Sequence, residues 1–176
     1  MTEAVSDRMA ELAAHQTRFV LDSFDHAAAW RLGTLMAERA LRENAPIIID
    51  IRKPTMVLFR SALAGTTADN EVWLERKART VFRFETSTAL LAARFVAQGV
   101  DLEAAGWFDT ERFTDAGGSF PLRVRGVGVV AAVTVSGLTS DEDHDFVIDG
   151  LTQYIDWQAP PSRICALVAL SRRTHP

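Results

Sequence analysis

The sequence predicts one domain of the α/β or α+β class, in which helices pack on a mostly antiparallel sheet. Two segments, 47–63 and 120–135, each contain two β-prone runs separated by a short turn, the pattern of a β-hairpin. Amphipathic helical segments lie before, between and after them. Strands joined by hairpins run antiparallel, and helices placed between hairpins are available to cover such a sheet. The 176 residues suit a single domain with a sizeable core.

The first half of the chain predicts two helices and the first hairpin. Residues 3–15 carry one apolar stripe at helical spacing, and residues 17–21 form a short β-prone run. A longer helix is expected over residues 25–43, with its charged side chains on the outer face. The apolar run 47–51 is typical of a central strand, and residues 56–63 read as its hairpin partner.

The middle of the chain predicts helical structure followed by a connection. Residues 69–84 have helical periodicity, and a separate helix is expected to begin at the Ser87 cap and end at Gly99. Periodicity alone does not decide between one broken helix and two. Residues 100–116 are acidic and read as a connecting segment.

The segment 117–157 predicts a second hairpin followed directly by a helix. Glycines separate a short strand over 120–124 from an apolar, β-branched strand over 129–135. Ser140 with Asp143 three residues later resembles a capping box, which would open the last helix. A buried strand that ends at a glycine turn and a helix N-terminus is a common place for a binding site.

Composition and charge exclude several classes of function. The net charge of −4 and the lack of a Lys/Arg cluster argue against nucleic-acid binding. No stretch approaches the roughly 20 apolar residues of a membrane span, and the acidic N-terminus is unlike a signal peptide. The single cysteine, Cys165, excludes an intramolecular disulfide and an all-cysteine metal site. A cytoplasmic location is the expectation.

Several motifs resemble a known family. The pattern GGSFPLRV…GVVAAVTVSGL…DEDH is similar to the signature region of the haem-degrading-like family, which includes GlcG, HbpS and the C-terminal domain of PduO. Five further segments resemble its single-domain branch in bacteria and fungi: Asp50 to Arg52, Ala62 to Thr66, Asp69-Asn70, Trp73 and Arg76-Lys77. The similarity covers roughly residues 15–157.

The resemblance implies a fold, an assembly and a candidate cofactor. It implies a five-stranded, mainly antiparallel sheet of profilin-like type with helices on both faces, assembled into homo-oligomers. We expect a single domain over residues 1–159 and a tail over 160–176 that is a candidate interface segment. The tail contains the apolar run 164–170, which reads either as a last strand or as a segment docked on a partner. Haem is the candidate cofactor, and the resemblance does not decide whether the chain is catalytic.

A first group of candidate residues would bind an acidic ligand. Arg52, Arg76 and Lys77 could form a cationic pocket for haem propionates, a carboxylate or a phosphate, with Trp73 as an aromatic wall. The alternative is a solvated helix face with local ion pairs and a packed aromatic residue. Ser136 lies in Val-Ser-Gly, which lacks the context of a nucleophile and is typical of a turn at a strand end.

A second group surrounds His144. Asp141 and His144 could hold a ligand or, as weak candidates, a divalent metal; no metal site is assigned. The alternative is that the acids around His144 complement the dipole of a helix N-terminus.

Three hypotheses of function remain. The first is a homo-oligomeric binding module for a small acidic ligand such as haem or a related cofactor. The second is an enzyme that degrades haem or acts on a small metabolite, for which no catalytic residue is identified. The third is a non-catalytic adaptor or structural oligomer.

Overall fold

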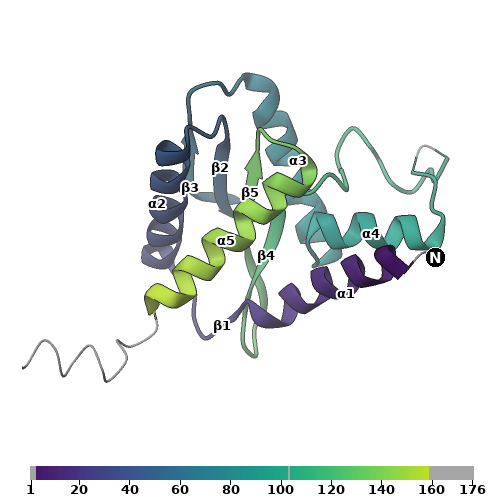
Figure 1. The fold of residues 1–176 in the computed structure, drawn as a ribbon, viewed down its shortest axis with the longest axis horizontal. Helices are drawn as coiled ribbons and strands as arrows, with labels where there is room; N and C mark the ends of the chain where they lie inside the picture. The colour runs from purple at the N-terminus through teal and green to yellow at the C-terminus, as the bar shows by residue number, and fades with distance from the viewer. Residues whose placement is uncertain (1–2, 103, 159–176) are drawn as a thin grey trace, which may run out of the picture.

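The computed structural model describes residues 3–102 and 104–158 and contains one five-stranded sheet (Figure 1). Its strands are β1 (Val20–Leu21), β2 (Ile48–Lys53), β3 (Met56–Ala62), β4 (Ser119–Val124) and β5 (Gly128–Ser136). They lie in the order β1-β4-β5-β2-β3. The β2–β3, β4–β5 and β2–β5 pairs are antiparallel, and β1 pairs with β4 in parallel. The expected α+β class and mainly antiparallel sheet are confirmed.

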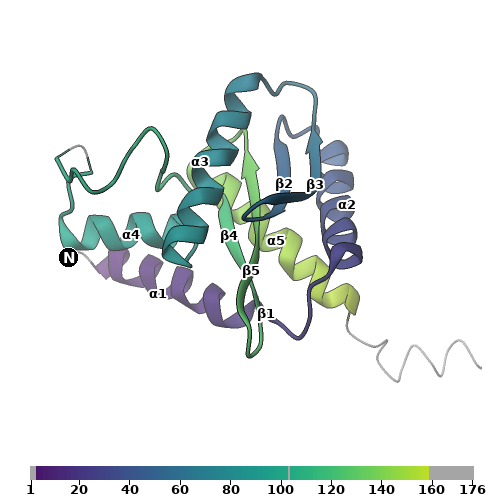
Figure 2. The ribbon, with the colours of Figure 1, turned by 180° about the vertical axis from the view of Figure 1, so that it is seen from behind.

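Helices cover both faces of the sheet. The helices are α1 (Glu3–Arg18), α2 (His26–Glu43), α3 (Ala68–Phe84), α4 (Thr88–Gln98) and α5 (Ser140–Gln158). Helices α2 and α5 pack on one face, and α3 covers the other, as Figures 1 and 2 show from opposite sides. Helices α1 and α4 pack against each other beside the sheet.

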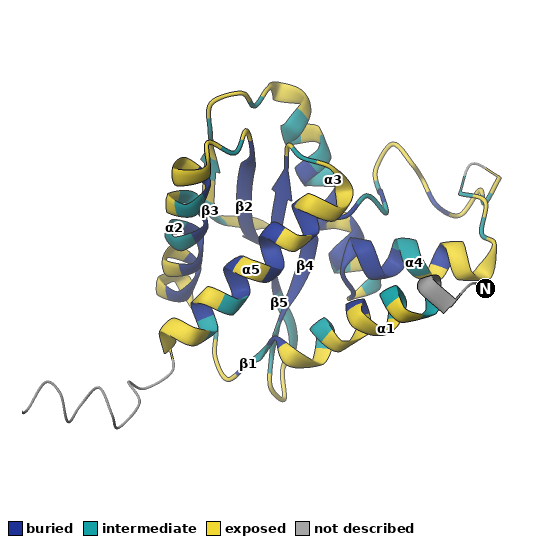
Figure 3. Cartoon of the chain, viewed as in Figure 1, coloured by how far each residue is buried: buried dark blue, intermediate teal, exposed yellow. Residues whose placement is uncertain are grey.

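The main core lies between the sheet and helices α2 and α5. The central strands are dark blue, meaning buried, over most of their length (Figure 3). The largest side chains sealed in this core are Phe19, Phe120 and Tyr154. No helix in the described part of the chain is long and apolar enough to span a bilayer.

Local capping signals fix the ends of the helices. The Asp25 carboxylate accepts a hydrogen bond of 2.7 Å from the Ala28 amide and so caps α2. Thr67 and Asn70 form a capping box at the start of α3. Ser87 caps α4. Glu85, between α3 and α4, has a left-handed backbone conformation with a φ of 48°, which ends α3. The region 69–97 therefore contains two helices.

Two details differ from the sequence-based expectation. Helix α1 continues to Arg18, three residues further than predicted, which leaves only two residues for β1. The expected capping box of α5 is displaced by one residue: Thr139 and Glu142 form it, with the Thr139 amide donating to Glu142 at 3.0 Å. Asp143 is not part of the box because its carboxylate is used elsewhere. The apolar run 164–170 lies outside the described residues.

Gly137 makes the turn from β5 into α5, and its replacement should destabilise the fold. Its φ is +149°, and a Cβ at this position would lie 2.2 Å from the Pro46 carbonyl oxygen. We expect Gly137→Ala to lower the free energy of unfolding by about 2 kcal/mol or more, because backbone must move to admit the methyl group.

Urea denaturation measures this change, with Gly106→Ala as the control. A Cβ at Gly106 meets nothing within 4 Å, so that variant should stay within about 0.5 kcal/mol of the wild type. Equal stability of the two variants would contradict the tight approach of Gly137 to Pro46.

Candidate functional site

A buried ion pair between Lys77 and Asp143 joins α3 to α5. The Lys77 ammonium donates to a carboxylate oxygen of Asp143 at 2.7 Å and to the carbonyl oxygen of Val135 at 3.1 Å. Both side chains are almost completely buried, with relative exposures of 4% and 2%. A buried charge is tolerated only when it is paired and hydrogen-bonded, so the two residues depend on each other.

The backbone around this pair is shaped to admit it. Gly118 has a φ of +112°, and a Cβ there would lie 2.7 Å from the Asp143 Cβ and 2.9 Å from the Lys77 Nζ. The other Asp143 oxygen accepts a hydrogen bond of 3.1 Å from the Leu138 amide. The glycine gives the lysine room, and the turn after β5 orients the carboxylate.

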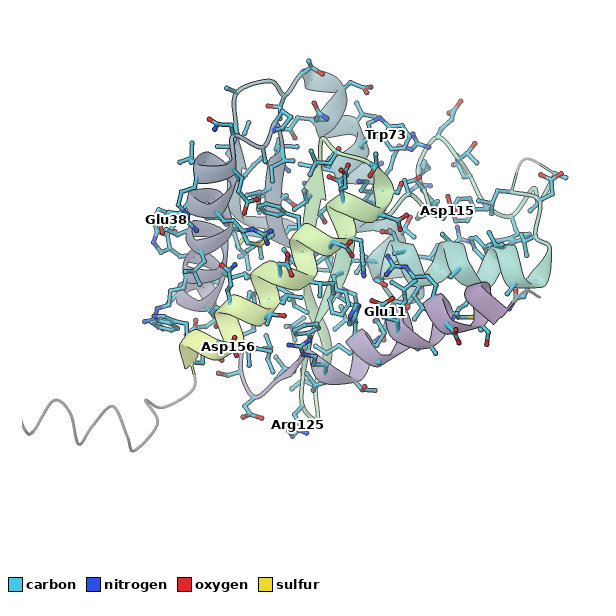
Figure 4. The ribbon with its side chains drawn as sticks, viewed as in Figure 1. Glu11, Glu38, Trp73, Asp115, Arg125 and Asp156 are labelled. Carbon is cyan, nitrogen blue, oxygen red and sulfur yellow. The ribbon has the colours of Figure 1, made fainter. Side chains whose placement is uncertain are left out.

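The pair stands at the wall of a cleft with a volume of about 370 Å³. The cleft lies between the first turn of α3 and the turn that leads into α5. Trp73, whose place on α3 is labelled in Figure 4, contributes its aromatic wall. The lining residues are Asp69, Asn70, Trp73, Lys77, Ala116, Ser136, Gly137, Leu138, Thr139, Ser140 and Asp143.

Several hydrogen-bond donors of this cleft have no partner among the described contacts. The carboxylate of Asp69 accepts the indole N–H of Trp73 at 3.0 Å, and both oxygens of Asp143 are already engaged. The Asn70 oxygen accepts the Thr67 amide, which leaves the Asn70 NH₂ group as a donor. Lys77 has three N–H groups, of which the described contacts use two.

Two helix N-termini add further donors. Asn70 lies in the first turn of α3, and Ser140 is the first residue of α5. Each helix N-terminus carries unpaired amides and the equivalent of about half a positive charge. The cleft is therefore suited to the negative oxygens of a ligand, although its own carboxylates reduce the positive potential.

Burial shifts both members of the ion pair toward neutrality. It lowers the pKa of Lys77, and the attraction of Asp143 opposes this effect only in part. It raises the pKa of Asp143 against the opposing effects of Lys77 and of hydrogen bonds from the Leu138 and Gly137 backbone. Both shifts make transfer of a proton from the ammonium to the carboxylate easier than between the same groups in water.

Three of the six predicted ligand residues come together here. Trp73, Lys77 and Ser136 line the cleft, and Ser136 is its buried strand-end residue. Arg76 lies next to them, with its guanidinium 4.4 Å from the Trp73 ring centroid, and donates to the Thr110 carbonyl oxygen at 2.6 Å. Arg76 therefore supports the tryptophan without lining the cleft.

The structure does not bring Arg52 into the cleft that Lys77 lines. Arg52 donates to Asp50 and to Glu75, each at 2.5 Å, and Asp50 also accepts from Arg60 at 2.9 Å. These ion pairs engage the Nε and Nη1 of Arg52, and Arg52 lines a separate hollow with residues 53–57. Glu75 also lies 3.5 Å from Arg79, four residues later on the same helix. Helical spacing predicts this local pair but gives no sign of the contact with Arg52, which lies on a strand.

His144 is buried away from the cleft and faces His15. Its Nε2 lies 3.4 Å from the His15 Nδ1, and its side chain is fully buried. Burial, the nearby His15 and Arg8 together lower the pKa of His144 to about 4, so it is neutral at pH 7. Asp141, its expected partner, instead pairs with Arg8 at 3.2 Å. Sequence reasoning missed His15 because it lies 129 residues away.

Comparison with known proteins places these observations in a family. The model of the family described as haem degrading protein HbpS-like matches residues 24–152. A UPF0303 protein of Streptomyces avermitilis is 41% identical over 156 residues, which cover 88% of this chain and 96% of the relative. Another, from Acidobacterium capsulatum, is 31% identical over 172 residues, covering 98% of this chain and 96% of the relative.

Solved structures agree with the fold. The crystal structure of the Ybr137w protein has a TM-score of 0.78 and 27% sequence identity, covering 89% of this chain and 94% of that one. A structure described as a PduOC–heme complex has a TM-score of 0.63 at 18% identity and covers 74% of this chain and 94% of that one. At that identity, the second comparison shows a shared fold alone.

Because His144 is buried and neutral, we expect the folded protein to lose stability in weak acid. Its pKa in the folded chain is about 4 against 6.5 for an ordinary histidine, so the unfolded chain binds more protons between these values. The free energy of unfolding should therefore fall as the pH falls, by about 2 kcal/mol from this group between pH 7 and pH 5.

Urea denaturation at the two pH values, compared between wild type and His144→Phe, isolates this contribution. The phenylalanine cannot take up a proton, so the variant should lose less stability on acidification. Replacement of the exposed His26 by Phe is the matched control for the same substitution at the surface. A His144→Phe profile parallel to the wild type would contradict the account.

Proposed function

The chain belongs to the HbpS-like family of haem degrading proteins, and from this premise we propose that it is a binding module whose cleft beside Lys77 takes a small carboxylate ligand. One observation carries the proposal: both oxygens of Asp143 are engaged and one oxygen of Asp69 accepts the Trp73 N–H, whereas Lys77, Asn70 and the α5 N-terminus retain donors. Charge-assisted bonds from such donors are among the stronger hydrogen bonds in proteins.

Trp73 gives this cleft a selective wall. The indole N–H donates a hydrogen bond to Asp69, and the Arg76 guanidinium lies over the ring. These two contacts fix the orientation of the Trp73 ring without a ligand. Trp73 and Lys77 lie one turn apart on α3, and an apolar ring beside a charged donor favours a small ligand with one carboxylate and a short carbon skeleton. Because the wall is fixed in advance, less conformational freedom is lost on binding.

The cleft residues do not fit haem through its iron. Haem iron in proteins is held by histidine, cysteine, methionine or tyrosine, and none of these is among the residues that line the cleft. His144, the predicted candidate, faces His15 in the interior. Membership of this family supports the proposal that the fold binds a ligand. The donors of this cleft favour a small organic acid as that ligand.

The other hypotheses have less support in the described residues. No cluster of three or more metal-ligating side chains occurs among residues 3–102 and 104–158. Self-association stays a proposal, supported by the exposed Trp30 and Trp157, which line a second, more apolar groove on α2 and the end of α5.

Titration with lactate tests the proposed function. We expect the wild type to bind one lactate per chain in isothermal titration calorimetry. Lys77→Met should weaken binding more than about tenfold, or about 1.4 kcal/mol, because the charged donor is lost. Trp73→Leu should also weaken it while leaving the buried ion pair in place.

Lys53→Met is the matched control, because Lys53 and Lys77 are the only lysines in the sequence. Circular dichroism confirms that each variant is folded before titration. Absence of lactate binding by the wild type, or an equal loss in Lys53→Met and Lys77→Met, would contradict the proposal.

A further inference from the structure

The buried lysine in this cleft has a feature that simple anion binding does not require. A cation placed to attract a carboxylate is usually exposed to the site and fully charged. Lys77 instead is buried, lies 2.7 Å from a carboxylate that can take its proton, and still contributes to the cleft lining. Lysines that react with carbonyl groups need this combination of a desolvated amine and a nearby acid–base group.

We propose that Lys77 forms a reversible imine with the carbonyl carbon of a small 2-oxo acid bound in this cleft. The inference rests on the proposed function, because two of its three donors, Asn70 and the α5 N-terminus, hold the ligand's carboxylate while Lys77 meets the carbonyl. Asn70 and Ser140, the first residue of α5, line the same cleft as Lys77 and supply that anchor. The carbonyl carbon of a 2-oxo acid is bonded directly to its carboxylate carbon, so anchoring the carboxylate also restricts where the carbonyl lies in the cleft.

The reaction is balanced by the residues of the ion pair. Proton transfer from the Lys77 ammonium to Asp143 gives a neutral amine and a neutral carboxylic acid. The amine lone pair forms a C–N bond to the carbonyl carbon, the C=O π pair moves to oxygen, and Asp143 protonates that oxygen. The positively charged nitrogen then returns a proton to Asp143.

Water leaves in the second half of the reaction. Asp143 protonates the hydroxyl group, the C–O bond breaks, and the nitrogen lone pair forms the C=N bond as water departs. The product is a protonated imine beside the ionised Asp143, so the charge of the original pair is restored. The sum is an ammonium and a carbonyl giving an iminium and one water, with no oxidant or reductant.

The surroundings of the pair favour this chemistry. Burial lowers the pKa of Lys77 and raises that of Asp143, which increases the fraction of neutral amine. The Val135 carbonyl oxygen orients the nitrogen, and Gly118 leaves space beside it because it has no Cβ. A positively charged imine in this position would still face the Asp143 carboxylate, as the ammonium does.

Borohydride trapping with pyruvate tests the inference. The wild-type chain is incubated with pyruvate and sodium borohydride, and intact-mass measurement with peptide mapping locates the reduced adduct. We expect one adduct per chain at Lys77, with Lys53 and the amino terminus unmodified; mapping is simple because the sequence has only two lysines. Lys77→Arg keeps the charge and should reduce trapping more than about tenfold, whereas Lys53→Arg should trap as the wild type.

Parallel calorimetry with lactate and pyruvate separates this inference from the proposed function. Lactate has the carboxylate but no carbonyl, so it should bind without forming an adduct. Binding of both acids with no adduct, or with adducts confined to Lys53 or the amino terminus, would overturn the imine and leave the binding module standing. Failure of both acids to bind would overturn both proposals.

Discussion

The ion pair of Lys77 and Asp143 is the constraint around which the site is arranged. An isolated charge in this position would cost several kcal/mol, so each residue requires the other. The pair connects the helix on one face of the sheet with the helix on the opposite face, past the end of β5. Gly118 must lack a side chain to leave room for it, and the Leu138 amide must point at Asp143 to complete its hydrogen bonds.

The cleft follows from this arrangement. The Asp143 carboxylate binds Lys77, so it does not cap α5, and Thr139 and Glu142 form the capping box instead. Ser140, the first residue of α5, lines the cleft. The start of α3 approaches from the other side and brings Trp73 with it. The placing of these donors beside a fixed aromatic wall is thus a consequence of how the two helices are joined. Family membership agrees with a ligand-binding role, and the proposal of a small organic acid rests on the donors of this cleft.

Local signals in the sequence predicted most of the fold. The hairpins, the helix ending at Glu43 and the cap at Ser87 depend on neighbours within a few residues, so pattern and capping rules found them. The ion pair joins residues 66 positions apart and the histidine pair joins residues 129 apart, and no local rule connects them. Arg52 was misplaced for the same reason: its partners were fixed by the pairing of strands and α3, which charge spacing does not show.

Nitrogen NMR of a sample labelled in its lysine side chains tests the central claim most directly, because Lys53 and Lys77 are the only two lysine signals in the chain. Lys77→Arg assigns the two resonances. On addition of lactate, the account predicts that the Lys77 side-chain nitrogen signal shifts and saturates while the Lys53 signal stays in place. A Lys77 signal that does not respond to any amount of lactate would show that the buried pair is only a structural link between α3 and α5.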